Sequence, residues 1–289
     1  MKIAIASGKG GTGKTTLAVN LFRSLVSRRQ EKVLLVDCDV EEPNDVLFFK
    51  ESQLQSEKSI YQEIPSIDTT SCTFCRLCAD YCEFNAIVVI PPANFAEVNP
   101  SLCHSCGACL VACESEAIWV RRESIGSRKY YSLNAGSGIL EGRLDIGSAM
   151  QTMVIRDLKS SIPEDLPWVI LDAPPGTSCP VVETLSDVDY VILVTEPTPF
   201  GLHDLKLMVE LVRVLEIPFG IIINKAQMGD QEIYSYLEEE KLEIIGEIPF
   251  NRAYASQYAS GNLFHDTPDE VKVSHEQILQ RLIEKGILR

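Results

Sequence analysis

Eight of the ten cysteines in this 289-residue chain fall into two copies of one spacing, with two, two and three residues between successive cysteines. The apolar pairs Ala86-Ile87 and Ala117-Ile118 repeat at the same offset as the cysteines. The eight residues are Cys72, Cys75, Cys78 and Cys82 in the first copy and Cys103, Cys106, Cys109 and Cys113 in the second. An internal duplication of this kind indicates a built metal site and not scattered thiols.

The rhythm of these thiols suits two 4Fe-4S clusters. Three cysteines separated by two residues each can wrap a tight loop around one cubic cluster, while the fourth points to the other cluster. Ligation is therefore predicted to be crossed between the copies. The expected ligands are Cys72, Cys75, Cys78 and Cys113 for the first cluster, and Cys103, Cys106, Cys109 and Cys82 for the second.

Two other uses of the cysteines fit less well. Zinc sites take four ligands each and leave a longer gap between the two cysteine pairs. A disulfide framework would suit a secreted chain, but strand-like residues 2–6 run straight into a glycine-rich loop, with no secretory signal before them. We therefore expect a cytoplasmic protein in a reducing compartment.

The cysteine-rich region, residues 68–120, resembles the bacterial two-cluster ferredoxin. Glu83 and Glu114 stand where that family has a proline after the fourth cysteine of each copy. This proline shapes the backbone and is not a ligand, so the departure bears on local geometry and redox potential more than on cluster binding. The resemblance implies an inserted α+β ferredoxin domain over residues 66–122.

A glycine-rich loop near the N-terminus indicates a second site. The motif G-x4-G-K-[ST] is complete over residues 8–15, between a predicted strand and a predicted helix. Backbone N–H groups of such a loop and the helix N-terminus attract phosphate oxygens. Lys14 is expected to reach the β- and γ-phosphates, and Thr15 to bind Mg²⁺. The predicted nucleotide-binding residues here are Gly8, Lys9, Gly10, Gly11, Thr12, Gly13, Lys14, Thr15 and Thr16.

A second lysine in this loop, Lys9, points to a particular family. The run from Lys9 to Thr15 resembles the deviant Walker loop of the MinD, ParA and nitrogenase iron protein superfamily. In that superfamily this lysine crosses a dimer interface to the nucleotide of the partner. The resemblance therefore implies a homodimer that ATP closes, with a solvated loop lysine as the alternative.

Later residues match the same family in its order. By this resemblance Asp37 supports the lysine and the metal and also lies at the nucleotide, Asp39 acts on the attacking water and on Mg²⁺, and Asp172 lies at Mg²⁺. Asn224 would contact adenine, and Pro249 would lie on the base side. Strand-terminal aspartates can also cap turns, but a set in this order favours phosphoryl transfer. The predicted catalytic residues are Lys9, Lys14 and Asp39.

Continuous apolar runs predict parallel strands that helices cover on both faces. We expect a doubly wound, mostly parallel α/β sheet of the P-loop type, with the ATPase domain formed by residues 1–65 and 123–289. The glycine-rich stretch 136–143 is interpreted as a mobile connector, with coupling of the two domains as the alternative. The expected strands are 2–6, 33–37, 168–172, 190–195, 219–223 and 244–248, and the expected helices are 14–29, 203–216, 230–241 and 269–286.

Charge and hydropathy restrict the partners. A net charge of −15 argues against nucleic-acid binding, which needs basic surface to neutralise phosphates. No apolar stretch reaches membrane-spanning length, and residues 273–289 are predicted to form a docked amphipathic helix rather than a membrane anchor. Cys38 and Cys179 are expected to be packed thiols, as free cysteines commonly are.

The leading hypothesis is an iron-sulfur ATPase with ATP or ADP, Mg²⁺ and two 4Fe-4S clusters as cofactors. Its nucleotide cycle would drive dimerisation and gate electron transfer to a redox or client partner, such as a related paralogue. Two alternatives stay open. One is an Mrp-type carrier of iron-sulfur clusters, and the other is a spatial-organising ATPase in which the clusters act as redox sensors or structural elements. The sequence leaves the electron donor, the acceptor and the role of Cys179 open.

Overall fold

The structure, a computed structural model, describes residues 1–29, 32–229 and 231–288 and divides into two compact units. The larger unit comprises Met1–Lys58, Arg128–Arg143 and Gln151–Arg289, and the smaller comprises Ser59–Ser127 and Leu144–Met150. The predicted insert, residues 66–122, falls wholly within the smaller unit.

The larger unit is built on parallel strands, as the apolar runs predict. Its strands lie in the order β11-β10-β9-β1-β8-β2-β7, and each neighbouring pair in this order is parallel. The strands predicted from the sequence are β1 (Lys2–Ala6), β2 (Val33–Asp37), β8 (Trp168–Asp172), β9 (Tyr190–Thr195), β10 (Phe219–Ala226) and β11 (Ile244–Pro249). The α/β class with a large, mostly parallel sheet is therefore confirmed.

Strand register brings the chemistry to one edge of this sheet. Asp37 at the end of β2 pairs with Asp172 at the end of β8. Ile5 near the end of β1 also pairs with Asp172, so the loop that follows β1 starts beside Asp172, with Asp37 one strand further along the sheet. In open parallel sheets, ligands bind outside the carboxyl ends of the strands.

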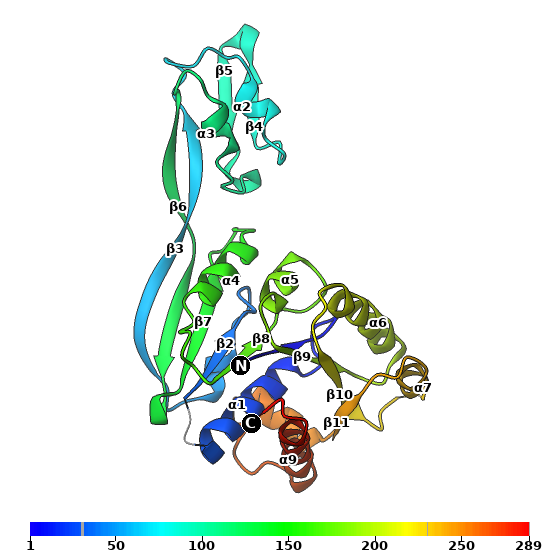
Figure 1. The fold of residues 1–289 in the computed structure, drawn as a ribbon. Helices are drawn as coiled ribbons and strands as arrows, with labels where there is room; N and C mark the ends of the chain where they lie inside the picture. The colour runs from blue at the N-terminus through cyan, green and yellow to red at the C-terminus, as the bar shows by residue number, and fades with distance from the viewer. Residues whose placement is uncertain (30–31, 230, 289) are drawn as a thin grey trace. The chain divides into compact units, whose positions relative to one another are not determined.

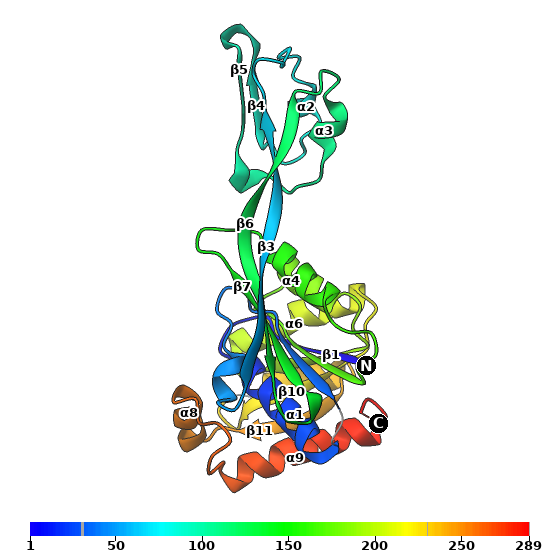
Figure 2. The same ribbon diagram turned by 90° about the vertical axis from the view of Figure 1, so that its left-hand side faces the viewer.

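Helices cover both faces of the sheet (Figure 1). On one face, Phe22 of α1 and Ile278 of α9 join the same buried core as Ile170 of β8, and Figure 2 shows α9 alongside β11. On the other face, α5 packs against β1 and α6 against β9. The helices are α1 (Lys14–Arg29), α4 (Gln151–Ser160), α5 (Cys179–Leu185), α6 (Pro199–Val214), α7 (Glu232–Glu239), α8 (Arg252–Ala259) and α9 (Asp269–Glu284), with the 3-10 helix η1 (Asp45–Phe48). The first residue of the helix expected at 230–241 lies outside the described residues.

The glycine-rich stretch 136–143 is not a mobile connector, and that prediction was wrong. After the 3-10 helix η4 (Asn134–Gly136), β7 (Gly138–Leu144) forms a strand that pairs in parallel with β2. Ile139 of β7 is fully buried. A Cβ atom on Gly142 would lie 2.5 Å from Cδ1 of Leu158 on α4, so this glycine permits close packing of the helix on the strand. Glycine content here reflects crowding rather than mobility.

The smaller unit contains the cysteine repeats and has a small core of its own. Ile87 and Val89 of the hairpin strand β4 pack with Cys78 and Cys109, and β4 pairs antiparallel with β5. Strands β3 (Gln53–Ile67) and β6 (Ile118–Ser132) contribute residues to both units. The other elements are α2 (Leu77–Asp80), β4 (Ile87–Ile90), η2 (Pro91–Ala93), β5 (Phe95–Val98), η3 (Pro100–Leu102) and α3 (Ala108–Ala112).

The C-terminal helix α9 is docked, as predicted for residues 273–289, of which residue 289 lies outside the described residues. Its residues Val271, Ile278 and Leu282 are almost fully buried. Within the described ranges, none of the helices combines the length and the apolar character needed to cross a bilayer.

His275 of α9 should make stability fall on acidification. It lies beside Tyr254 of α8, with 3.4 Å between Nε2 and Oη, and burial lowers its pKa to about 4. The unfolded chain then binds a proton that the folded chain excludes, so stability is lost as pH falls from about 6.5 towards 4. Between pH 7.5 and 5, the free energy of unfolding measured by urea denaturation should decrease by about 2 kcal/mol less in His275→Phe than in the wild-type chain. The exposed His203, changed to Gln, is the control; equal pH dependence of the two variants would contradict the assignment.

Candidate functional site

A cleft of about 390 Å³ opens beside the phosphate-binding loop of the larger unit, residues 8–15. The cleft brings together residues from the loop, from the segment after β2 and from the ends of β10 and β11. Of the predicted site residues, those lining the cleft are Gly10, Gly11, Gly13, Lys14, Thr15, Thr16, Asp39, Asn224 and Pro249. Gly8, Lys9 and Thr12 instead line a small adjoining pocket, and Asp37 and Asp172 are buried.

The loop is held in shape by a contact from β10. Asn224 donates from Nδ2 to the carbonyl oxygen of Thr12, at 2.7 Å. Gly13 has φ +99°, and a Cβ atom there would lie 2.2 Å from the same Nδ2. Only glycine fits this conformation and this close approach. Asn224, predicted at adenine, therefore also braces the loop.

The Lys14 side chain is a buried cation at the centre of the loop. Its Nζ donates to Ser7 Oγ at 3.1 Å and to the carbonyl oxygen of Lys9 at 3.4 Å. Burial lowers the pKa of Lys14, while the charges of Asp172 and Asp39 act in the opposite direction. Among the residues the structure describes, Lys14 forms no ion pair. An ammonium group in this setting is suited to receive an anion such as a phosphate.

Carboxylates gather beneath the loop. Thr15 Oγ1 donates to Asp172 Oδ2 at 2.6 Å, so two of the three predicted Mg²⁺ ligands are in contact. Asp37 accepts backbone N–H bonds from Asp39, Asn44 and Asp45 at 2.8–3.1 Å, which fixes the turn after β2. Burial raises the pKa of Asp172 to about 7 and also raises those of Asp37 and Asp39. These carboxylates therefore need a compensating cation or proton.

Asp45 was not predicted. It is fully buried, and neither of its carboxylate oxygens has a hydrogen-bond partner in the described part of the chain. One ligand atom each from Asp37, Asp45 and Asp172 lies within 4.8 Å of the others. Oxygen ligands of this kind suit Mg²⁺. These three carboxylates thus fit a magnesium ion, and the only sequence signal for Asp45 is its place six residues after the predicted catalytic Asp39.

Lys9 is paired within its own chain. Its Nζ contacts Oε1 of Glu196, the residue that follows β9, and Lys225 Nζ lies 2.9 Å from Oε2 of the same carboxylate. Burial raises the pKa of Glu196, but the two lysines outweigh it, so the net pKa lies below the ordinary value. The sequence did not predict Glu196 or Lys225.

Aromatic residues complete the cleft on the side of Pro249. Phe250, Tyr254 and Tyr258 line it, and Tyr254 is held by a 2.7 Å hydrogen bond from Asn20. Aromatic faces of this kind can stack on a planar heterocycle. The side of the cleft away from the phosphate loop is therefore suited to a base.

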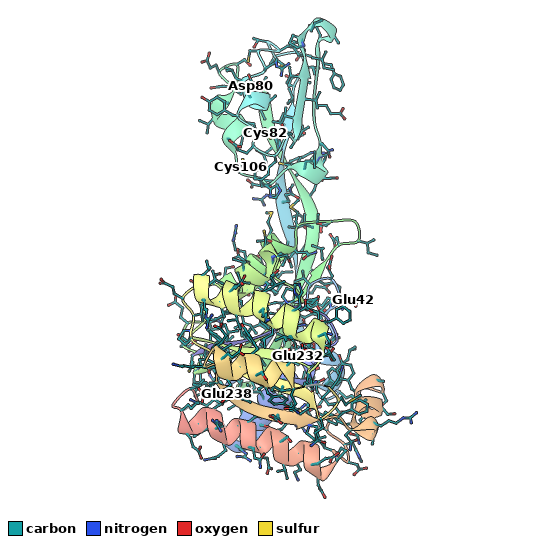
Figure 3. All side chains as sticks on the ribbon, turned by 90° about the vertical axis from the view of Figure 1, so that its right-hand side faces the viewer. Glu42, Asp80, Cys82, Cys106, Glu232 and Glu238 are labelled. Atoms are coloured by element: carbon teal, nitrogen blue, oxygen red, sulfur yellow. The ribbon has the colours of Figure 1, made fainter. Side chains whose placement is uncertain are left out.

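In the smaller unit, the eight repeat cysteines form two groups. One cavity is lined by Cys82 together with Cys103, Cys106 and Cys109, and another by Cys113 together with Cys72, Cys75 and Cys78. Each group thus takes three cysteines from one copy and the fourth from the other, and Figure 3 labels Cys82 and Cys106 of one group. Crossed ligation requires this grouping.

Backbone N–H groups point at sulfur in both groups. Phe74 donates to Cys72 and Ser105 to Cys103, at 3.3 and 3.4 Å, and both donors have φ +53°. The same pattern recurs at the fourth cysteines: Ala86 donates to Cys82 and Ala117 to Cys113, both at 3.3 Å. Donors of this kind stabilise thiolate charge. The two copies therefore repeat the sulfur environment as well as the spacing.

Burial acts against the thiolates when no metal balances them. It raises the pKa of Cys78 to about 11, and it raises the pKa values of Cys103 and Cys109. Without a metal these three thiols are protonated near neutral pH, so metal binding must release their protons.

The two cysteines outside the repeats differ in exposure. Cys38 is buried as expected, whereas Cys179 is exposed. Cys179 lies at the first position of α5, and the expectation that it packs was wrong.

Comparisons with known proteins place these features in context. Residues 3–264 match the family described as CobQ/CobB/MinD/ParA nucleotide binding domain. The chain is 31% identical over 286 residues to the uncharacterized protein MJ0578 of Methanocaldococcus jannaschii, covering 98% of this chain and 97% of that protein. It is 23% identical over 306 residues to an iron-sulfur cluster carrier protein of Pyrococcus abyssi, covering 98% of this chain and 86% of that protein.

Among solved structures, the septum site-determining protein MinD of Pyrococcus horikoshii OT3, complexed with Mg-ADP, is similar in fold. The TM-score is 0.61 at 16% sequence identity, and the match covers 99% of this chain and 96% of that one.

Proposed function

Because this chain belongs to the CobQ/CobB/MinD/ParA nucleotide-binding family, we propose that it is a Mg²⁺-dependent ATPase that couples nucleotide binding to electron transfer. The electrons would pass through two 4Fe-4S clusters in the smaller unit to a partner protein. The observation that carries this proposal is the crossed grouping of eight cysteines in one chain with a phosphate-loop cleft.

At the cleft, the residues have the charges that phosphoryl transfer needs. Lys14 carries an unpaired positive charge to the β- and γ-phosphates, and Thr15 with Asp172 holds the magnesium ion of the substrate. Asp39 lines the cleft and has a raised pKa because of burial, which suits a carboxylate that accepts a proton from water. The aromatic side of the cleft holds adenine.

In the smaller unit, the cysteine sets fit 4Fe-4S clusters. Each set offers four sulfurs around one cavity, with backbone N–H donors already directed at two of them. When bound, each cluster supplies one-electron redox chemistry. The protein tunes this chemistry through its N–H donors and through burial, which for Cys78 and Cys109 leaves about 9% of the residue surface exposed.

The proposed working form is a nucleotide-dependent homodimer in the cytoplasm, which transfers electrons to a redox or client protein. Lys9 is the residue we assign to the dimer interface, where it would reach the nucleotide of the second copy. Asp37, Asn224 and Pro249 complete the nucleotide site.

The proposal is tested by EPR of the anaerobically reconstituted, dithionite-reduced protein, with and without Mg-ATP, in parallel with sedimentation. We expect signals from two reduced clusters, and we expect these to shift as Mg-ATP drives dimerisation. Signals and sedimentation that are the same in the ATP, ADP and nucleotide-free states would contradict the coupling.

A second candidate function is cluster delivery, favoured by the relatives that are named iron-sulfur cluster carrier proteins. A carrier must release its clusters to an apo-protein, whereas an electron-transfer protein retains them. Delivery would be favoured if the clusters moved to an apo-ferredoxin acceptor faster than they were lost to a chelator, and if this transfer depended on Mg-ATP.

A further inference from the structure

Glu196 holds two lysines at the edge of the nucleotide cleft. Its oxygens are divided between them: Oε1 contacts Lys9 Nζ, and Oε2 lies 2.9 Å from Lys225 Nζ. The Glu196 side chain is only 12% exposed, against 30% for Lys9 and 36% for Lys225. One carboxylate thus faces two cations, and the group keeps a net positive charge.

Both lysines belong to the phosphate loop and its surroundings. Lys9 is a loop residue, and its carbonyl oxygen accepts hydrogen bonds from Ser7 Oγ at 2.7 Å and from Lys14 Nζ. Lys225 lines the cleft and donates to the carbonyl oxygen of Gly11 at 3.2 Å. A triphosphate in this cleft therefore competes with Glu196 for the Lys225 ammonium group, and a triphosphate in the second copy of a dimer competes for that of Lys9.

The backbone of Glu196 is the tightly packed part of this cluster. Thr198 N donates to the carbonyl oxygen of Glu196 at 2.8 Å, and a Cβ atom on Gly201 would lie 2.2 Å from that oxygen. The first turn of α6 therefore packs tightly on the Glu196 backbone. The lysine side chains are long and partly exposed, so they are the members that move when phosphate arrives.

We propose that Glu196 is a positioning residue that restrains Lys9 and Lys225 in the nucleotide-free chain and releases them to a triphosphate. This inference rests on the proposed nucleotide function of the cleft and adds to it a residue that sets ATP affinity. Partly exposed ion pairs are weak and screened by salt, so phosphates can displace them at a modest cost in affinity.

The test is a calorimetric titration of the full nucleotide-free chain with the Mg²⁺ complex of a non-hydrolysable β,γ-imido ATP analogue. Because Glu196→Gln removes the competitor, we expect affinity to rise about three- to tenfold. Glu42→Gln is the matched control. Glu42, labelled in Figure 3, also lines the cleft but forms no described ion pair with either lysine. We expect it to change affinity less than about twofold.

A double-mutant cycle distinguishes a restraint from a merely structural role. In a Lys9→Ala background, Glu196→Gln should retain no more than about a twofold gain, because only the Lys225 pair remains. The gain should also shrink at about 0.5 M salt, where the Debye length falls to a few ångströms. Unchanged or weaker binding by Glu196→Gln, or a full gain in the Lys9→Ala background, overturns the restraint.

The outcomes separate this inference from the proposed function. If the wild-type chain binds the analogue but Glu196→Gln gives no gain, only the restraint fails. If the wild-type chain does not bind the analogue, both fail. If the EPR signals do not change with nucleotide but Glu196→Gln still raises the affinity, the restraint by Glu196 is supported and the proposed coupling to the clusters is wrong.

Discussion

Replacing Cys113 with serine should remove the same cluster as replacing Cys75, although Cys113 belongs to the other sequence copy. Cys113 shares a cavity with Cys72, Cys75 and Cys78, so its loss leaves that set with three sulfurs. We expect iron content in the reconstituted protein to fall from about eight to about four atoms per chain. Iron analysis measures the loss, and EPR shows which signal disappears.

Two variants of the other cysteine set test the same assignment of cysteines to clusters. Cys82→Ser and Cys106→Ser should both remove the second EPR signal, because these residues line the other cavity. Cys179→Ser is the control, since this exposed cysteine lies in the larger unit and should cost no iron in the monomer. If Cys113→Ser instead removed the signal that Cys106→Ser removes, each copy would hold its own cluster and crossed ligation would be wrong.

The central strands were predictable because their burial is visible in their composition. Strands β1 and β8 are buried on both faces, since Ile3 and Ala4 of β1 and Ile170 and Leu171 of β8 are at most 1% exposed, so the runs that contain them are continuously apolar. β3 lacks this signal. Its residues Gln53–Ile67 are mostly exposed in the first half, and its composition is polar. Its position in the sheet depends on pairing with β6, which no local pattern reveals.

The site was predictable where its residues are close in sequence. The residues of the phosphate loop, and those of each cysteine repeat, lie within a short segment. Their spacing alone therefore predicts which group the loop can bind. Glu196 contacts Lys9 across 187 positions of the chain. Asp45 of η1 lies near Asp172 because its N–H donates to Asp37, which pairs with Asp172 across neighbouring strands. Those contacts exist only because parallel strands end at one edge, and the order of strands is not written in any one segment.

Lys14→Met should abolish the nucleotide response while leaving the clusters in place. The side chain of methionine is unbranched and fills the buried position of Lys14, but it carries no charge for the phosphates. Loss of one preorganised charge at the transferring phosphoryl group costs about 100- to 1,000-fold in turnover, and we expect ATP hydrolysis to fall by at least that range. Iron content and thermal unfolding should match wild type, because Lys14 lies in the larger unit and forms no described ion pair.

The same variant tests the coupling of nucleotide to the clusters. Sedimentation should show no ATP-dependent dimer, and the EPR signals should no longer shift with Mg-ATP. Cluster signals that still shifted in this variant would mean that nucleotide reaches them through a site other than this cleft.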